Sequence, residues 1–241
     1  MKTTLLEVSI DTLTMGESVE RVADFIRSGR PHRVLTLNPE FLYRAQSDPE
    51  LMELAGRADL VTPDGIGIVW ACRMAGHPVV ERVTGIDLML SLAGRAAAEN
   101  WRIYMLGAAP GVAKEAAERL CLDYPGLQVV GTHHGYFSMG EEAAGVAEIV
   151  RQTRPQLIFV ALGAPKQEQW IDHYLELSGA SVAVGVGGSF DVIAGKVQRA
   201  PQWSQRLHLE WLARLLREPT RWRRQLVLPR FAWLVLRKYW F

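Results

Sequence analysis

Over its first 200 residues the chain alternates short apolar runs with longer amphipathic stretches. Several of the runs are almost continuously apolar, which indicates strands that helices cover on both faces. Strands of this kind, alternating with stretches of helical length, are typical of an α/β domain with a mainly parallel sheet. The pattern predicts strands at LLEV, IDTLT, RVLTLN, ADLVTP, WRIYMLG, LQVVGTH, QLIFVALG and SVAVGVGG, the first two as a candidate hairpin.

Helices are predicted between these strands, where apolar residues recur at helical spacing. Hydroxyl and carboxylate side chains near several starts are candidate N-caps, because they accept from the free amides of a first turn. The predicted helices are 17–29, 39–56 with a break near Pro49, 65–76, 85–99, 111–123, 141–153 and 165–178, and the candidate caps are Ser18, Asp48, Thr84 and Ser138.

Charge divides the chain unevenly, although the net charge of the whole is only +1. Residues 203–241 carry nine Lys or Arg against two acids, a net +7, so that residues 1–202 carry −6. The same 39 residues hold five of the eight tryptophans. Such asymmetry predicts two parts, an α/β core over 1–202 and a basic, aromatic, helical appendage over 203–241.

Cysteine usage and hydropathy exclude several settings. Cys72 and Cys121 match no metal-binding or redox spacing, which favours a reducing cytosol and a core-filling role for both. Glu7 and Asp11 interrupt the N-terminal stretch where a signal peptide would be apolar, and no apolar run reaches about 20 residues. We therefore expect a protein that is neither secreted nor membrane-spanning.

Glycine or proline follows five of the predicted strands, at the point where a helix begins. In open α/β sheets the ligand site lies at the carboxyl ends of the strands, so these junctions should converge there. Gly107, Gly163 and Gly187 would let backbone amides approach a ligand closely, and helix N-termini favour negative charge. An anionic, phosphorylated ligand is the prediction, with ordinary tight turns as the alternative.

Known phosphate and metal fingerprints are missing from the sequence. It contains no G-x-x-x-x-G-K-[ST], no complete G-x-G-x-x-G, no H-E-x-x-H and no D-x-D. A kinase-type or dinucleotide enzyme is therefore disfavoured, and we predict neither a metal nor a cofactor. The pair His133 and His134 is interpreted as polar turn residues. Side-chain cations must then neutralise any diphosphate.

Six motifs follow in order over about 30–241: LTLNPEF, DLVTPDGIGIVW, ERVTGIDL, LGAPKQEQW, GVGGSFDVIAGKVQRAP and LEWLARLLREPTRWRR. Together they resemble the WecG/TagA/CpsF family of bacterial glycosyltransferases, its TagA-type members above all. The resemblance implies inverting transfer of N-acetylmannosamine from a UDP-sugar donor to undecaprenyl-diphosphate-linked N-acetylglucosamine, in the synthesis of the wall teichoic acid linkage unit. It also implies a Rossmann-like three-layer core, a membrane-binding C-terminal appendage and a cytoplasmic enzyme bound peripherally at the inner membrane face.

An inverting transfer needs one base to remove the proton of the acceptor hydroxyl. Asp64 suits this role because it ends a predicted strand in the cleft, behind the stiffening Pro63. Gly65 and Gly67 would leave room for the sugar. Taken alone, Asp64 is more simply an N-cap of the helix that follows; the family resemblance favours the base.

Other candidates lie at neighbouring strand ends. Thr36, placed in the catalytic set with Asp64, and Asn38 would bind the sugar, with turn capping as the alternative. Pro165 is expected at the first helical position, which places Lys166 and Gln167 on a first turn facing phosphate and substrate; the alternative is a solvated helix start. Asp191 would accept from ribose or uracil, or cap a helix. Further candidates are Arg82 for diphosphate, and Lys196 and Arg199 for the same pocket.

Four tail arginines are candidates for the missing diphosphate cations. Arg214, Arg217, Arg221 and Arg224 follow at intervals of three, four and three, which places them on one helical face unless Pro219 bends the helix. Guanidinium groups suit diphosphate oxygens because they donate in a bidentate manner. The alternative is a solvated basic face.

The end of the chain, RFAWLVLRKYWF, has the aromatic, aliphatic and basic make-up of a segment in a membrane interface. Packing on the core or on another subunit is the alternative, so homo-oligomerisation stays open. Two other functions also stay open: a transferase of this family with another UDP-sugar donor, such as a uronic acid, and a non-enzymatic membrane-surface binding module. Nucleic acid is disfavoured as a partner because the tail is rich in aliphatic residues.

Overall fold

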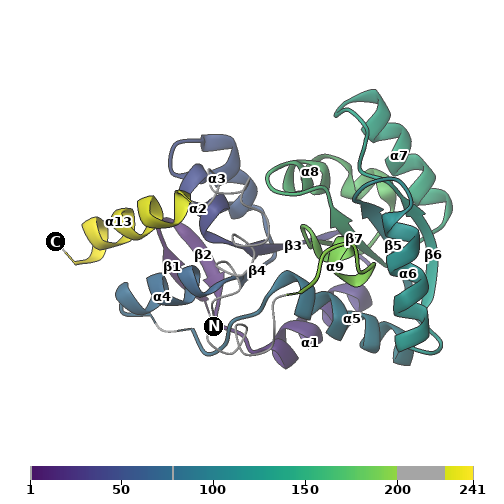
Figure 1. Cartoon of the computed structure of the whole chain (residues 1–241), viewed down its shortest axis with the longest axis horizontal. Coiled ribbons are helices and arrows are strands. Elements are labelled where there is room, and N and C mark those ends of the chain that lie inside the picture. Colours follow the sequence, from purple (N-terminus) through teal and green to yellow (C-terminus); the bar gives the residue numbers. More distant parts are fainter. Residues whose placement is uncertain (1, 78, 200–225, 241) are drawn as a thin grey trace.

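The computed structural model describes residues 2–77, 79–199 and 226–240. These residues form a six-stranded parallel sheet flanked by helices, with a separate two-stranded antiparallel hairpin beside it (Figure 1). The α/β prediction is confirmed, the hairpin included. The strands are β1 Lys2–Leu5, β2 Val8–Asp11, β3 His32–Leu37, β4 Leu60–Pro63, β5 Arg102–Gly107, β6 Gln128–His133, β7 Leu157–Ala161 and β8 Val182–Gly185.

Every predicted helix is present, with ends that move by one or two residues. The segment 39–56 forms two helices on either side of residues 46–48, and a short helix after β8 was not predicted. The helices are α1 Met15–Ser28, α2 Pro39–Ala45, α3 Pro49–Gly56, α4 Ile66–Met74, α5 Gly85–Glu99, α6 Val112–Asp123, α7 Glu141–Gln152, α8 Lys166–Ser178, α9 Ser189–Ile193 and α13 Val227–Tyr239.

The central sheet has the strand order β4-β3-β8-β7-β5-β6. Because all six strands are parallel, their carboxyl ends lie along one edge. The alternation of side chains shows that both faces are covered: Leu157 and Phe159 of β7 pack in a cluster with α1, α5 and α6, whereas Ile158 and Val160 pack with α7 and α8. Figure 1 shows these two groups of helices on opposite sides of the sheet.

A third apolar cluster joins the hairpin to α2, α3, α4 and α13. Phe231 and Val235 of α13 are buried in it, and the Tyr239 hydroxyl accepts from the amide of Leu6 at 2.9 Å. The final helix therefore packs on the core, as one of the two interpretations of the C-terminal segment expected. The predicted boundary at 202/203 falls outside the described residues. No described helix is long and apolar enough to cross a bilayer.

The observed helix starts confirm two of the four predicted N-caps and contradict the other two. Asp48 and Thr84 cap α3 and α5 as expected. Thr14, and not Ser18, caps α1, since the capping box of Thr14 and Glu17 lies one turn earlier. Ser138 does not cap α7, whose N-cap is Gly140, although the Ser138 hydroxyl donates to Glu142.

Two further expectations concern single residues. Pro165 is the N-cap of α8 and not its first residue, so the N1 prediction is wrong. Cys72 is buried, and burial raises its pKa to about 11, whereas Cys121 is exposed; the core-filling prediction thus holds for Cys72 alone.

Candidate active site

Asp64 lies where β3 and β4 end side by side. Leu37 pairs with Pro63 in parallel register, and the Asp64 amide donates to the Leu37 carbonyl at 2.8 Å. The Asp64 carboxylate Oδ2 accepts from the amide of Gly85, the first residue of α5, at 3.3 Å. Gly65 is the N-cap of α4 and no side chain caps it, so Asp64 is not the cap of the helix that follows it. The positive end of α5 instead stabilises the charge of Asp64.

Thr36 and Asn38, from the neighbouring strand, both bond to backbone. The buried Thr36 hydroxyl donates to the carbonyl of Gly185 at the end of β8, at 2.8 Å. Asn38 Oδ1 accepts from the Phe41 amide at 2.9 Å and caps α2, as the capping interpretation expected. Their contacts with sugar stay predictions.

Gln167 connects α8 to the loop after β8. Its side-chain oxygen accepts from the Gly187 amide at 3.0 Å, and its Nε2 donates to Glu168 Oε1 at 2.8 Å. Only 3% of Gln167 is exposed. The side chain predicted to contact substrate therefore holds the backbone beside the site, which leaves any substrate contact as a prediction.

Glu168, next to Gln167, is a buried carboxyl that sequence reasoning did not single out. Burial raises the pKa of its carboxyl to about 7, the Gln167 amide opposing this shift by hydrogen bonding. Its position carried a signal, because Glu168 precedes Ile171 and Leu175 at intervals of three and four, on the buried face of α8.

The three predicted nucleotide-loop glycines fall into two groups. A Cβ on Gly107 would lie 2.4 Å from the Ala161 carbonyl oxygen, so β5 needs glycine there to pack against β7. Gly163 and Gly187 have φ of +77° and +54°, and a Cβ on either would meet nothing within 4 Å. Open space beside Gly163 and Gly187 agrees with close approach of a ligand.

The expectation about space at Gly67 is corrected, whereas the one about the charge of Lys166 stays open. A Cβ on Gly67 would lie 2.7 Å from Pro39 Cγ, so this glycine accommodates α2 and not a sugar. Lys166 Nζ donates to the carbonyls of Phe137 and Gly135 at 2.7 and 3.3 Å and lies over the Phe137 ring. Lys166 thus ties the loop after β6 to α8, and its contact with phosphate stays a prediction.

Residues 3–241 match the profile of the family described as "Glycosyl transferase WecG/TagA/CpsF family". The chain belongs to the WecG/TagA/CpsF family. It is 41% identical over 204 residues to the N-acetylglucosaminyldiphosphoundecaprenol N-acetyl-beta-D-mannosaminyltransferase of Bacillus spizizenii W23, covering 85% of this chain and 78% of the relative. The proteins of that name from Bacillus subtilis 168 and Staphylococcus aureus MW2 are 36% and 32% identical, covering 85% and 97% of this chain and 79% and 92% of the relatives.

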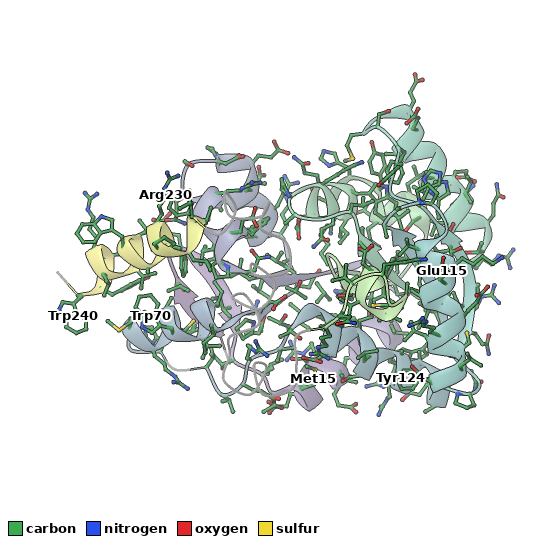
Figure 2. All side chains as sticks on the ribbon, viewed as in Figure 1. Met15, Trp70, Glu115, Tyr124, Arg230 and Trp240 are labelled. Carbon is green, nitrogen blue, oxygen red and sulfur yellow. The ribbon has the colours of Figure 1, made fainter. Side chains whose placement is uncertain are left out.

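In this member of the WecG/TagA/CpsF family, ion pairs join the segment after α9 to helices α5 and α6. Arg199 pairs with Asp87 of α5 at 2.6 Å, and Lys196 pairs with Glu115 of α6 at 2.7 Å. Glu115 is labelled on α6 in Figure 2. Both cations therefore have carboxylate partners, which weakens their candidacy for phosphate.

Two further candidates, Asp191 and Arg82, lie near the carboxyl ends of strands β8 and β4. Asp191 lies half-buried in the first turn of α9. Arg82 lies beside the end of β4, because the backbone amide of its neighbour Val83 donates to the Pro63 carbonyl at 3.1 Å. Among residues 2–77, 79–199 and 226–240, no cluster of three or more His, Cys, Asp or Glu could hold a metal. Arg214, Arg217, Arg221 and Arg224 lie outside the described residues.

Proposed function

We propose that this protein transfers N-acetylmannosamine from a UDP-sugar donor to N-acetylglucosaminyldiphosphoundecaprenol, with inversion, on a Rossmann-like three-layer core. The names of its relatives, aligned over most of the chain, support the transferred sugar and the acceptor. The observation that carries the mechanism is the Asp64 carboxylate, held at a helix N-terminus where parallel strands end.

The proposed reaction is a single displacement. The acceptor hydroxyl attacks the anomeric carbon, its proton passes to Asp64, and the bond from that carbon to the UDP oxygen breaks. A base must be ionised before it can accept a proton. The Gly85 amide and the dipole of α5 both favour the ionised carboxylate, so Asp64 is prepared for this step.

The neighbouring strand ends would bind the donor. Backbone at Gly163 and Gly187 has open space beside it for the nucleotide, and Asp191 would accept from ribose or uracil. Thr36, Asn38 and Gln167 would line the sugar side. In the absence of a metal motif, the negative charge of departing UDP requires cations. We assign this role to Arg82 and to the four tail arginines Arg214, Arg217, Arg221 and Arg224.

The outer face of α13 supports peripheral binding to the inner membrane face. Its buried face, with Phe231 and Val235, packs on the core, while Trp233 and Trp240 are 62% and 68% exposed. Arg230 and Arg237 alternate with these tryptophans at helical spacing, a composition suited to the headgroup level. Figure 2 shows Trp240 and Trp70 of α4 at the same end of the molecule. This face would bring the tail arginines and the lipid-linked acceptor to the site.

The test is incubation with UDP-N-acetylmannosamine and a soluble N-acetylglucosamine lipid-diphosphate, following both UDP and the disaccharide. Formation of both products in equal amounts is expected. A panel of other UDP-sugars, including a uronic acid, tests the donor. Faster turnover with another UDP-sugar would show that this sugar, and not N-acetylmannosamine, is the one transferred. If no UDP-sugar releases UDP, the protein is a binding module and the proposal fails.

A further inference from the structure

Glu168 is a buried carboxyl that no step of the proposed reaction uses. Only 8% of the residue is exposed. Its Oε1 accepts from Gln167 Nε2 at 2.8 Å, whereas Oε2 finds no hydrogen-bond partner among the described residues. Burying a carboxyl with one oxygen unpaired costs free energy that an apolar side chain would not incur. The residue therefore needs an explanation other than packing.

That explanation begins with the Gln167 amide, which has an oxygen at one end and an N–H₂ group at the other. Glu168 accepts from the nitrogen, and this leaves the oxygen facing the Gly187 amide at 3.0 Å. Gly185 closes the space around the amide, because a Cβ there would lie 2.7 Å from Gln167 Nε2. The acceptor on Glu168 thus fixes which end of Gln167 meets Gly187.

The backbone from Gly185 to Gly187 in turn bonds to Thr36 and lies close to Gly85, the residue that donates to Asp64. The Gly185 carbonyl accepts from Thr36, and a Cβ on Gly85 would lie 3.5 Å from Val186 Cα. The amide of Gly85 is the donor to Asp64. A shift of this backbone segment would therefore move the partners of Thr36 and of Asp64 together.

We propose that Glu168 is a positioning residue, which orients the Gln167 amide and thereby holds backbone 185–187 against Thr36 and Gly85. Its effect on catalysis rests on the function proposed above. Its effect on the backbone does not depend on that function, because the hydrogen bonds that join Glu168 to Gly187 through Gln167 exist without substrate.

The charged groups around Glu168 come from the elements packed on it. Arg33 of β3 and Asp172 of α8 line the same cavity of about 20 Å³ as Glu168, together with apolar residues of β3 and α3. Asp172 pairs with Arg33 at 3.3 Å and with Arg57 at 2.7 Å. Asp172 thus engages both arginines. Burial raises the pKa of Glu168 to about 7, and the hydrogen bond from Gln167 opposes this rise.

The experiment follows the Gly187 amide of the full chain by NMR, as proton shift and hydrogen exchange. Glu168→Gln keeps an acceptor for Gln167, and Glu168→Met removes it at similar volume. Exchange at Gly187 should accelerate about tenfold in Glu168→Met, as expected for a lost buried hydrogen bond, and stay within about twofold of wild type in Glu168→Gln. The wild-type Gly187 shift should titrate with a midpoint near 7, and in Glu168→Gln it should not.

Several results would overturn the proposal. One is unchanged Gly187 exchange in folded Glu168→Met; another is a Gly187 shift that stays constant while the Glu168 carboxyl titrates. If Glu168→Met does not fold, the titration of the Gly187 shift in the wild type decides. With turnover measurable, Glu168→Met should raise the donor KM about tenfold and Glu168→Gln should restore it. A wild type without turnover refutes the proposed function alone, since the Gly187 readout still decides the role of Glu168.

Discussion

The carboxylate of Asp64 accepts a hydrogen bond from the amide of Gly85 across 21 residues of sequence. This contact joins the end of β4 to the start of α5, and it gives Asp64 a fixed orientation and a stabilised charge. Gly85 is itself fixed by close packing, because a Cβ there would lie 3.3 Å from the Thr36 hydroxyl. The proposed base is therefore held by backbone that has little room to move.

Asp64→Asn should abolish transfer with little loss of stability. The amide has the shape of the carboxylate but cannot take the proton, so kcat should fall about 10²- to 10⁴-fold, the range for loss of a general base. The melting temperature should change only modestly, because the charge–dipole interaction of a partly buried carboxylate contributes about 2 kcal/mol at most. Rates of UDP release and thermal unfolding measure the two effects. The control is Asp24→Asn, an exposed aspartate paired with Arg27, which should leave both unchanged; substantial activity in Asp64→Asn would exclude the base role.

Substitutions on the two faces of α13 should separate core packing from membrane binding. Phe231 is 2% exposed, so Phe231→Ala should lower the free energy of unfolding by about 3 to 5 kcal/mol. Trp233 is 62% exposed, so Trp233→Ala should change stability by about 0.5 kcal/mol or less and weaken binding to anionic vesicles. Denaturant titration and vesicle sedimentation measure these effects. Unchanged vesicle binding of Trp233→Ala would argue against the outer face as the membrane contact.

The burial of Phe231 also predicts the effect of truncation on stability. Removal of 203–241 takes away α13 and uncovers the apolar cluster that it shares with α2 and α4. A truncated chain should therefore be less stable than the full chain.

Sequence patterns predicted what depends on neighbours in the chain. The strands, most helices and the caps Asp48 and Thr84 follow from periodicity and local hydrogen bonding. The bond from Thr36 to Gly185 spans 149 residues and exists because β3 lies beside β8. No periodicity gives that strand order. The filling of the space at Gly67 by Pro39 is likewise a tertiary contact, so the predicted room for a sugar could not be checked from sequence.

Gly185→Ala should disturb the site through Gln167. The new methyl group would lie 2.7 Å from Gln167 Nε2, and only 3% of Gln167 is exposed. We expect a loss of about 1 to 3 kcal/mol in stability, typical of an overpacked core, together with reduced turnover. Gly145→Ala is the matched control: it lies exposed in α7 with nothing within 4 Å of a Cβ, and it should stabilise by about 0.5 to 1 kcal/mol. A Gly185→Ala protein as stable and active as wild type would show that the backbone of β8 can shift to accommodate the methyl group.

Glu168 should make stability fall as the pH rises. Its pKa is about 7 in the folded chain against 4.5 for an ordinary glutamate, so between these values the folded state binds more protons than the unfolded state. The stability contributed by this group is complete below pH about 4.5 and is lost as the pH rises through about 7, by about 3 kcal/mol, since one pKa unit corresponds to about 1.4 kcal/mol.

Glu168→Gln removes this titration and keeps the acceptor for Gln167. Urea titrations at pH 5 and pH 8 should therefore show that the free energy of unfolding falls less in the variant than in wild type at the higher pH. A difference between the two proteins that is the same at both values would mean that Glu168 ionises as an ordinary carboxyl. In that case its charge would have to be compensated in the folded chain, and Arg33, which lines the same small cavity, is the cation placed to do so.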